Sequence, residues 1–298
     1  MRVGIIGGTG FVGGYLVDAL LAHGHEVNVL VRHGSEHKVR QSAKVNVVTG
    51  DLDSTAALSA VLEGCDAAIY NVGLLREFPR RGITFEQTQY QGVVDTVAAA
   101  RQAGVQRLLL MSAIGVKDPG TRYQATKRRA EIHALESGLD VTVLRPSVIF
   151  GDPRGTMEFA TQLFRDMIKP PLPAVAFPGV RMSPVHIKDV VDAFCASLKD
   201  DSTIGKTIEL AGPETLDWRE IVQRVAAAAG KSKTILPMPL WVMRIGATLF
   251  DWLPFYPVTR DQLTMLEEGN TGTADAVESL IGREAQPFTP DSLRYLKC

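Results

Sequence analysis

The sequence predicts an α/β protein with a doubly wound parallel sheet and a smaller carboxyl-terminal lobe. Two observations carry this prediction: short apolar runs alternate with helical stretches from the start of the chain, and proline becomes frequent after Arg145. Runs that are apolar throughout are typical of strands buried on both faces of a parallel sheet. We therefore expect a large domain over residues 1–150, completed by return segments from later in the chain, and a loop-rich lobe over residues 151–298.

Six short runs rich in Val, Ile and Leu have the pattern of buried strands: Val3–Ile6, Val27–Val31, Val45–Val48, Ala67–Asn71, Arg107–Met111 and Val141–Leu144. Four helical stretches separate them: Phe11–His23, Ala56–Leu62, Phe85–Ala103 and Tyr123–Glu136. Several of these stretches end at a glycine, the residue that most readily adopts the left-handed conformation of a helix stop. Strands joined by helical crossovers form a parallel sheet with helices on both faces.

Three further helices are expected in the second lobe: Asp189–Leu198, Asp217–Ala229 and Leu240–Leu253. The last of these has a wide apolar face, and Pro254-Phe255-Tyr256-Pro257 follows it. Membrane-surface helices usually carry several basic residues, whereas this helix has only Arg244. Ordinary packing is therefore the favoured interpretation, and a docking face or an apolar substrate pocket is the second.

The amino-acid composition argues against several classes of protein. The 298 residues include 32 basic and 33 acidic ones, a balance that gives no support to a nucleic-acid partner. Cys65, Cys195 and Cys298 are too few and too far apart for a disulfide framework or a metal site, which favours a reducing cytoplasmic location. We expect no membrane-spanning segment, because no apolar run is long enough, and no signal peptide, because the first strand begins at Arg2.

A glycine turn lies between the first strand and the first helix. It reads Gly7-Gly8-Thr9-Gly10-Phe11-Val12-Gly13, which fits both the GxGxxG and the GxxGxxG spacing. Glycine lets backbone amides approach phosphate oxygens closely, and the helix that follows presents its free amides and positive dipole end. The turn therefore predicts a dinucleotide site that all seven residues line; the alternative is a turn that binds nothing.

The end of the second strand bears on which dinucleotide is bound. An acidic residue that binds an adenosine ribose is expected there, and the sequence has Arg32 instead. Because a guanidinium pairs with a 2′-phosphate that a carboxylate would repel, NADP(H) is favoured and NAD(H) remains the alternative. Lys38 and Arg40 could assist, although Arg32 could also be an ordinary solvated side chain.

Two other strand ends contribute candidate cofactor contacts. Asp51 and Leu52 follow the third strand and could border the adenine, although Asp51 could instead cap the next turn. Asn71 and Gly73 follow the fourth strand, where the chain has to pass the nicotinamide-side ribose.

The catalytic candidates are Tyr123 and Lys127, four residues apart and therefore on one helix face. A nearby ammonium is expected to lower the pKa of a phenol, so Tyr123 could transfer a proton while Lys127 binds the cofactor ribose. Ser112, after the fifth strand, could donate a hydrogen bond to the substrate. The alternatives are a surface tyrosine and a serine bonded to the backbone.

These residues resemble the short-chain dehydrogenase/reductase superfamily in its extended and atypical forms. Gly7 to Gly13 resemble its glycine loop, Tyr123 to Lys127 its YxxxK motif, Arg145 to Gly151 the segment after its sixth strand, and Pro184 to Val190 a second-lobe motif. The match covers residues 1 to about 215. The resemblance implies that Pro146 and Val148 also contact the cofactor.

Within this superfamily the chain most resembles the nucleotide-binding accessory-subunit family of respiratory complex I and its free-standing bacterial relatives. That family is implied to bind NADP(H), in mitochondria as a structural cofactor. One departure concerns catalysis, because the position of the substrate-binding Ser or Thr could fall on Ile114 rather than Ser112.

Two functions follow as expectations. The first is an oxidoreductase that acts on a carbonyl or carbinol of an apolar metabolite. The second is a non-catalytic nucleotide-binding subunit or assembly factor of a respiratory or quinone-related complex, in peripheral contact with the inner membrane. Arg76, Arg80 and Arg81 lie in a loop that could be a mobile flap beside the cofactor, or an ordinary exposed loop.

Overall fold

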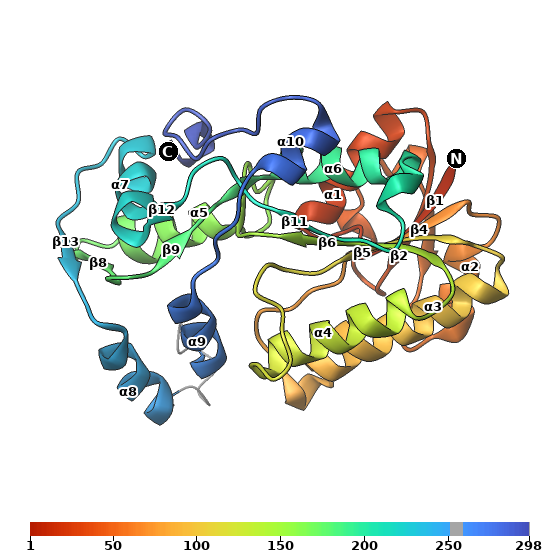
Figure 1. Cartoon of the computed structure of the whole chain (residues 1–298), viewed down its shortest axis with the longest axis horizontal. Helices are drawn as coiled ribbons and strands as arrows, with labels where there is room; N and C mark the ends of the chain where they lie inside the picture. The colour runs from red at the N-terminus through yellow and green to blue at the C-terminus, as the bar shows by residue number, and fades with distance from the viewer. Residues whose placement is uncertain (251–258, 298) are drawn as a thin grey trace. The chain divides into compact units, whose positions relative to one another are not determined.

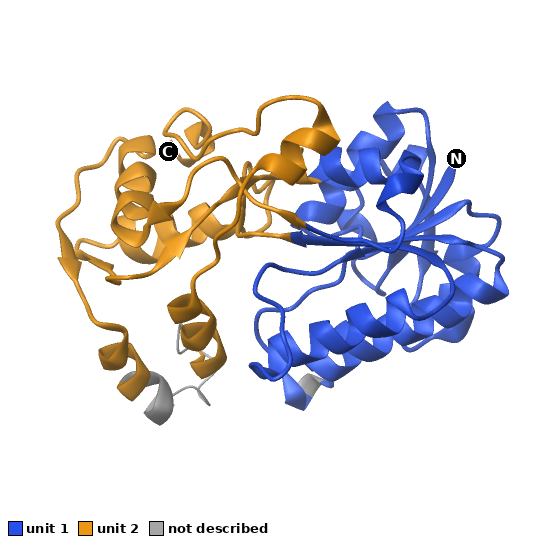
Figure 2. Cartoon of the chain, in the orientation of Figure 1, with its two compact units in different colours: residues 1–145, 191–208 blue, residues 146–190, 209–298 orange. Residues whose placement is uncertain are grey.

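The computed structural model describes residues 1–250 and 259–297, which fall into two compact units (Figure 2). Unit 1 comprises residues 1–145 and 191–208, and unit 2 comprises the described part of residues 146–190 and 209–298. The chain passes from one unit to the other after residues 145, 190 and 208. Residues 251–253 of the expected helix, the Pro254–Pro257 segment and Cys298 lie outside the described residues.

A seven-stranded parallel sheet forms the centre of unit 1 and confirms the predicted fold class. Its order is β11-β6-β5-β4-β1-β2-β3. The strands are β1 (Arg2–Ile6), β2 (Glu26–Val31), β3 (Asn46–Thr49), β4 (Ala67–Tyr70), β5 (Arg107–Met111), β6 (Asp140–Pro146) and β11 (Thr207–Leu210). The order reverses direction between β1 and β4, and doubly wound sheets bind ligands at the carboxyl ends of the strands beside such a point.

The sequence did not predict β11. This strand has only four residues, of which Thr207 and Glu209 are exposed, so it lacks the enrichment in Val, Ile and Leu that indicated the other six strands. Its position at the edge of the sheet explains that composition, because an edge strand has fewer neighbours to bury its side chains.

Helices cover both faces of the sheet, as Figure 1 shows for α2, α3 and α4 on one face and α1 and α6 on the other. Their bounds are α1 (Phe11–Ala22), α2 (Thr55–Leu62), α3 (Gly92–Gln102), α4 (Arg122–Leu135) and α6 (Ile187–Lys199). Leu58 and Val61 of α2 and Val93 and Val97 of α3 pack in one buried cluster with side chains of the central strands. These helices therefore fix the carboxyl edge of the sheet that carries the candidate site.

The expected helix Phe85–Ala103 is interrupted. A π-helical segment over Glu86–Gln91 precedes α3. The buried Tyr70 hydroxyl of β4 donates to the Thr88 carbonyl, and a Cβ at Gly92 would lie 2.2 Å from that hydroxyl. The tyrosine thus occupies the space of a regular turn, and the helix widens around it.

Unit 2 has short elements around its own apolar core. Its helices are α5 (Phe159–Leu163), α7 (Trp218–Ala228), α8 (Leu240–Phe250), α9 (Arg260–Glu268) and α10 (Asp275–Ile281). Its strands pair two by two: β7 (Ile149–Phe150) with β10 (Val185–His186), β8 (Ala174–Ala176) with β13 (Ile235–Pro237), and β9 (Arg181–Met182) with β12 (Leu216–Asp217). Phe150 and Trp218 are buried in the core that these elements enclose.

The sequence predicts neither a membrane-spanning segment nor a metal site, and the structure describes residues 1–250 and 259–297. None of the helices described there is long and apolar enough to cross a membrane. The same residues contain no group of three His, Cys, Asp or Glu side chains that could hold a metal ion.

Candidate functional site

The glycine turn is packed backbone against backbone. Gly7 has a φ of +96°, and a Cβ on it would lie 2.5 Å from the Asn71 carbonyl oxygen. A Cβ on Gly13 would lie 2.2 Å from the Gly7 carbonyl oxygen, so α1 begins in direct contact with the end of β1. Gly8 is equally restricted, because its Cβ would lie 2.6 Å from a methyl group of Val29. Three glycines are therefore required by packing alone.

Gly10 differs from these three. It is the N-cap of α1, and a Cβ there would meet nothing closer than the Gly7 carbonyl oxygen at 3.7 Å. Gly14 N–H makes the helical bond to the Gly10 carbonyl at 2.9 Å, which leaves the amides of residues 11–13 without partners inside the helix. The first turn of α1 has no acidic residue and Gly10 has no side chain to cap it, so this helix end suits an anion.

Basic side chains lie beyond the end of β2. Arg32 is exposed and forms no ion pair with any residue that the structure describes. Arg40, by contrast, is paired with Asp18 of α1, with 3.3 Å between Nε and Oδ2. Arg32, with exposed Lys38 nearby in sequence, is thus better placed than Arg40 to meet a further negative charge.

The other expected cofactor contacts lie at the same edge. Asp51 is exposed, and the cap of α2 is Ser54 rather than Asp51, so the aspartate has no capping role there. Leu52 is half-buried against the core below the sheet. Asn71 donates from Nδ2 to the Gly7 carbonyl at 3.4 Å and so supports the glycine turn, whereas Gly73 is exposed with open space around it.

Tyr123 and Lys127 are both buried in the first two turns of α4. A capping box fixes the start of this helix, since Thr121 accepts from the Gln124 amide and the Gln124 side chain accepts from the Thr121 amide. Lys127 Nζ donates to the Met111 carbonyl at 3.2 Å and lies 5.8 Å from the centre of the Tyr123 ring. The expected pairing of the two side chains on one helix face is present.

The prediction that Lys127 lowers the pKa of the Tyr123 phenol is wrong in sign. Burial raises the pKa of Tyr123, and burial lowers the pKa of Lys127 to about 8 despite the nearby Glu131 carboxylate. Both shifts have one cause, because a site that excludes water disfavours the phenolate and the ammonium alike. At neutral pH the tyrosine is therefore a protonated phenol.

Glu131 is a site residue that the sequence reasoning missed. It lies one turn after Lys127 and is fully buried, with Arg128 at 3.0 Å and Arg145 at 2.5 Å from its Oε2. Burial alone would raise the pKa of Glu131, but the hydrogen bond from Arg145 and its other partners lower it. The helical i, i+4 spacing from Lys127 was the one signal in the sequence that could have indicated it.

Ser112 is buried immediately after β5. Its amide donates to the Leu144 carbonyl at 2.7 Å, while its hydroxyl has no hydrogen bond of good geometry among the described residues. The hydroxyl is still close enough to Glu131 to help lower the pKa of that carboxyl. Ser112 and Lys127 line a crevice that is too narrow for a water molecule.

The loop after β4 is ordered around Tyr123. Phe78 and Ile83 exchange backbone hydrogen bonds of 2.7 and 3.3 Å, which close the loop that contains Arg80. Glu77 accepts from the Phe85 amide at 2.8 Å and pairs with Arg122 of α4. Phe85 in turn packs edge-on against the Tyr123 ring, with 5.7 Å between the ring centres. Contacts within the loop and with α4 therefore hold this segment, for which the sequence left open a mobile flap or an ordinary exposed loop.

Pro146 and Val148 belong to unit 2. Pro146 is the last residue of β6 and is buried. The Val148 amide donates to Asn270 Oδ1 at 3.1 Å, so this amide already has a partner within its own unit.

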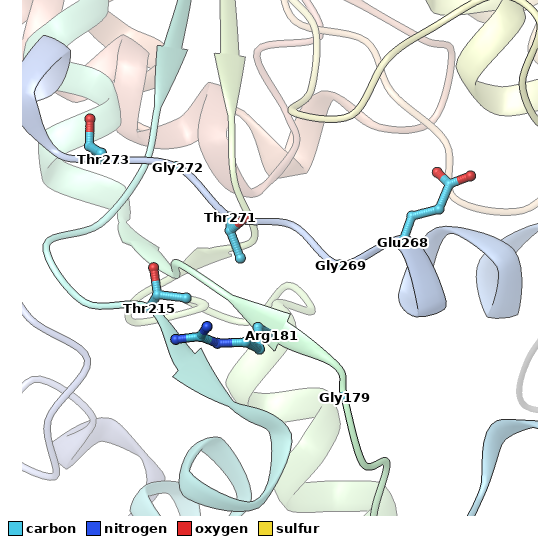
Figure 3. Close-up of a pocket in the computed structure, with 8 residues that line it drawn as sticks. All are labelled: Gly179, Arg181, Thr215, Glu268, Gly269, Thr271, Gly272 and Thr273. Carbon is cyan, nitrogen blue, oxygen red and sulfur yellow. The ribbon is translucent and has the colours of Figure 1, made fainter.

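Unit 2 contains a polar pocket that no motif indicated. Its volume is about 480 Å³, and Figure 3 shows its lining of three glycines, three threonines, Arg181 and Glu268. Residues between α9 and α10 form one wall, and β9 with the turn before β12 forms the other. The lining comes from three separate segments of the chain, which is why inspection of the sequence did not find it.

A doubly wound sheet with a glycine turn beside the point where its strand order reverses defines a class of dinucleotide-binding proteins. The chain belongs to the NAD(P)H-binding family, whose model matches residues 7–167. The expectation of an NAD(P)-binding protein is confirmed at this level.

The relatives of the chain include proteins named as reductases and proteins named as subunits of a respiratory complex. The ceramide reductase of Caulobacter vibrioides is 29% identical over 257 residues, which cover 84% of this chain and 78% of that protein. The mitochondrial NADH dehydrogenase (ubiquinone) 1 alpha subcomplex subunit 9 of Arabidopsis thaliana is 27% identical over 295 residues, covering 92% and 70%. A solved nucleoside-diphosphate-sugar epimerase from Pseudomonas aeruginosa shares the fold, with a TM-score of 0.75 at 18% identity over 98% of this chain and 95% of that one.

Proposed function

We propose that the chain is an NADP(H)-dependent reductase of a carbonyl group on an apolar metabolite. The observation that carries this proposal is the buried pair of Tyr123 and Lys127 at the carboxyl edge of the sheet, with the phenol held in its protonated form. A protonated, buried phenol is suited to donate a proton to a carbonyl oxygen, which is the reductive direction.

The cofactor fits the residues at this edge. The amides of residues 11–13 would hold the diphosphate, and the exposed Arg32 would favour a 2′-phosphate and hence NADPH over NADH. When bound, NADPH supplies a hydride to the substrate carbon. In this proposal unit 1 is the nucleotide-binding domain and unit 2 is the substrate lobe.

The remaining roles belong to the chain's own side chains. Tyr123 donates its proton to the substrate oxygen, and the Lys127 ammonium stabilises the phenolate that remains. The Ser112 hydroxyl, which lines the same crevice as Lys127, is a second hydrogen-bond donor. Glu131 acts as a positioning residue, because its carboxylate offsets part of the burial penalty on the ammonium.

Two observations support an apolar substrate. Leu75 and Phe78 are 61% and 41% exposed on the loop after β4, the same loop that brings Phe85 onto Tyr123. One relative is named as a reductase of ceramide, an apolar lipid. An apolar molecule would replace water at these side chains when it approaches the site.

The test is a pair of tyrosine variants. Purified protein should oxidise NADPH with an apolar ketone or with ceramide precursors that carry a ketone, and Tyr123→Phe should abolish turnover while NADPH binding, measured by fluorescence, persists. Tyr90→Phe is the matched control, since Tyr90 contacts His133 and Arg129 rather than the candidate site. Equal turnover in both variants would refute the assigned role of Tyr123.

A second function, a non-catalytic nucleotide-binding subunit, is supported by one feature of the site. The substrate-binding Ser or Thr of active reductases could fall at Ile114, and the half-buried side chain of Ile114 has no hydrogen-bond donor. A subunit of this kind would be a cytoplasmic protein in peripheral contact with a respiratory complex at the inner membrane. It would retain its nucleotide through gel filtration, copurify with that complex and show no turnover.

A further inference from the structure

Exposed apolar side chains gather in two segments of unit 2, residues 164–176 and 231–245, which we call the apolar edge. Ten large hydrophobic residues of the described chain are exposed, and half of them lie in these segments. They are Leu172, Leu236, Trp241, Val242 and Ile245, with exposed fractions of 69%, 50%, 62%, 38% and 55%. Such a concentration on a water-facing surface indicates a binding surface.

The two segments are held side by side. Strands β8 and β13 pair in parallel, with Ala174 opposite Ile235. Just before this pair, Lys233 Nζ donates to the carbonyls of Pro170 and of Leu172, the latter at 2.7 Å. Figure 1 shows α8 following directly from β13, so the loop at Leu172, the strand pair and the helix form one continuous edge of unit 2.

Helix α8 has two faces with different surroundings. Leu240 and Met243 pack against the core of unit 2. Trp241 and Ile245 lie four residues apart and therefore share another face, which is exposed. The expectation that this helix packs in an ordinary way thus holds for one face and is wrong for the other.

The charge of the apolar edge is positive. The two segments contain five basic residues, Arg165, Lys169, Lys231, Lys233 and Arg244, against the single acidic residue Asp166. Arg165 pairs with Asp166 and Arg244 pairs with Glu267 of α9, so Lys169, Lys231 and Lys233 carry the surplus of positive charge. The whole chain has a net charge of −1, so this surplus is local. The sequence argument counted only Arg244 of α8, whereas the structure adds the basic residues of the neighbouring strand and loop.

We propose that the apolar edge docks unit 2 onto a bilayer surface that contains anionic phospholipids. Tryptophan favours the boundary between headgroups and acyl chains, and leucine and isoleucine side chains insert beside it. Lysine and arginine meet the phosphates while their aliphatic stems cover apolar surface. This surface would bring the protein to substrates that partition into lipid, but it does not depend on the reductase assignment.

A second copy of the chain is a poorer occupant. A symmetric dimer through this edge would bring five basic residues of one copy against the same five of the other, and like charges across an interface are unfavourable.

The test is vesicle flotation of the full chain without nucleotide, with phosphatidylcholine vesicles alone and with roughly a third phosphatidylglycerol added. We expect the protein to float with the anionic vesicles and to be released by high salt. Trp241→Ser/Ile245→Ser and Lys169→Glu/Lys231→Glu should each weaken binding about tenfold or more. Met157→Ser, another exposed apolar residue, and Lys44→Glu/Lys297→Glu are the matched controls and should bind as the parent does.

Three results would overturn the proposal: no flotation with anionic vesicles, binding that the control variants weaken as much as the edge variants do, or self-association that the Trp241→Ser/Ile245→Ser variant abolishes in place of vesicle binding. Circular dichroism of every variant shows whether it is folded. Because no cofactor or substrate is present, failure of this test leaves the reductase proposal untouched, and failure of the Tyr123→Phe test leaves this one untouched.

Discussion

Glu131 and Arg145 form a two-pronged ion pair that ties α4 to the end of β6. Arg145 Nε lies 2.7 Å from Oε1 of the glutamate, and Nη2 lies 2.5 Å from Oε2. The carboxylate is fully buried and the guanidinium is 15% exposed. Lys127 lies one turn before Glu131 on the same helix, so the pair also places a negative charge beneath the candidate catalytic lysine.

Replacement of this buried carboxylate is expected to be costly. Glu131→Gln removes the carboxylate charge from the buried pair with Arg145, and breaking such a pair usually costs about 3–5 kcal/mol. Urea unfolding monitored by circular dichroism measures the loss. The control is Glu86→Gln, which removes an ion pair with Arg129 in which both side chains are about half exposed and should cost at most about 1 kcal/mol. Equal losses in the two variants would contradict the structural importance of the buried pair.

The lowered pKa of Lys127 predicts that the free energy of unfolding depends on pH. Its pKa falls from 10.5 to about 8 on folding, so below pH 8 the folded state bears the full cost of a buried ammonium. Between about pH 8 and 10.5 the unfolded chain binds the extra proton, and stability rises with pH. Lys127→Met should therefore be more stable than the parent at about pH 7, by at most about 3 kcal/mol, and this difference should shrink toward pH 10. A difference that does not change with pH would contradict the lowered pKa.

The fold was predictable because its signals are local. The central strands are short runs rich in apolar residues and several of the helices between them end at a glycine, so the sequence sufficed for the parallel sheet. The edge strand Thr207–Leu210 and the two- and three-residue strands of unit 2 escaped prediction, because pairing over long sequence distances creates them without any periodicity. The widened turn at Glu86–Gln91 depends on Tyr70, a contact that no local pattern contains.

The candidate site was predictable only in part. The spacing of Tyr123 and Lys127 fixed their common helix face, and the structure brings them together. The direction of their pKa shifts was not predictable, because it depends on how completely Phe85 and the neighbouring strands exclude water. The partnership of Glu131 with Arg145 escaped notice for a similar reason, since it joins a helix to a strand end fourteen residues away.

Substitutions at two neighbouring glycines of α1 distinguish the effect of packing on stability from the effect of helix propensity. Alanine favours a helix over glycine by about 1 kcal/mol, so both Gly13→Ala and Gly14→Ala gain in that respect. A Cβ at Gly13 would lie 2.2 Å from the Gly7 carbonyl oxygen, whereas at Gly14 it would meet only the flexible Arg40 side chain at 3.3 Å. Thermal unfolding should show Gly13→Ala destabilised by about 2 kcal/mol or more and Gly14→Ala unchanged or stabilised. Similar melting temperatures would argue against the close approach of α1 to β1.

A substitution at Gly10 tests whether the amides at the start of α1 bind the diphosphate. Its Cβ would have room in the folded protein, so Gly10→Ala should lose only a few tenths to about 1 kcal/mol of stability. If the amides that follow bind a diphosphate, the added methyl group obstructs the ligand, and the Kd for NADPH should rise about tenfold or more. Titration calorimetry measures the affinity. Unchanged affinity in a folded variant would show that the diphosphate lies elsewhere.

Selectivity between the two nicotinamide dinucleotides should depend on Arg32. Its guanidinium forms no ion pair with the described residues and lies at the end of β2, where a 2′-phosphate is expected. Arg32→Ala should raise the Kd for NADPH roughly tenfold, the value of one charge-assisted contact, and leave the Kd for NADH almost unchanged. Arg40→Ala is the matched control, because Asp18 already pairs with that guanidinium and its removal should affect both dinucleotides equally. Parallel losses of NADPH and NADH affinity in Arg32→Ala would instead assign this arginine to the diphosphate that both cofactors share.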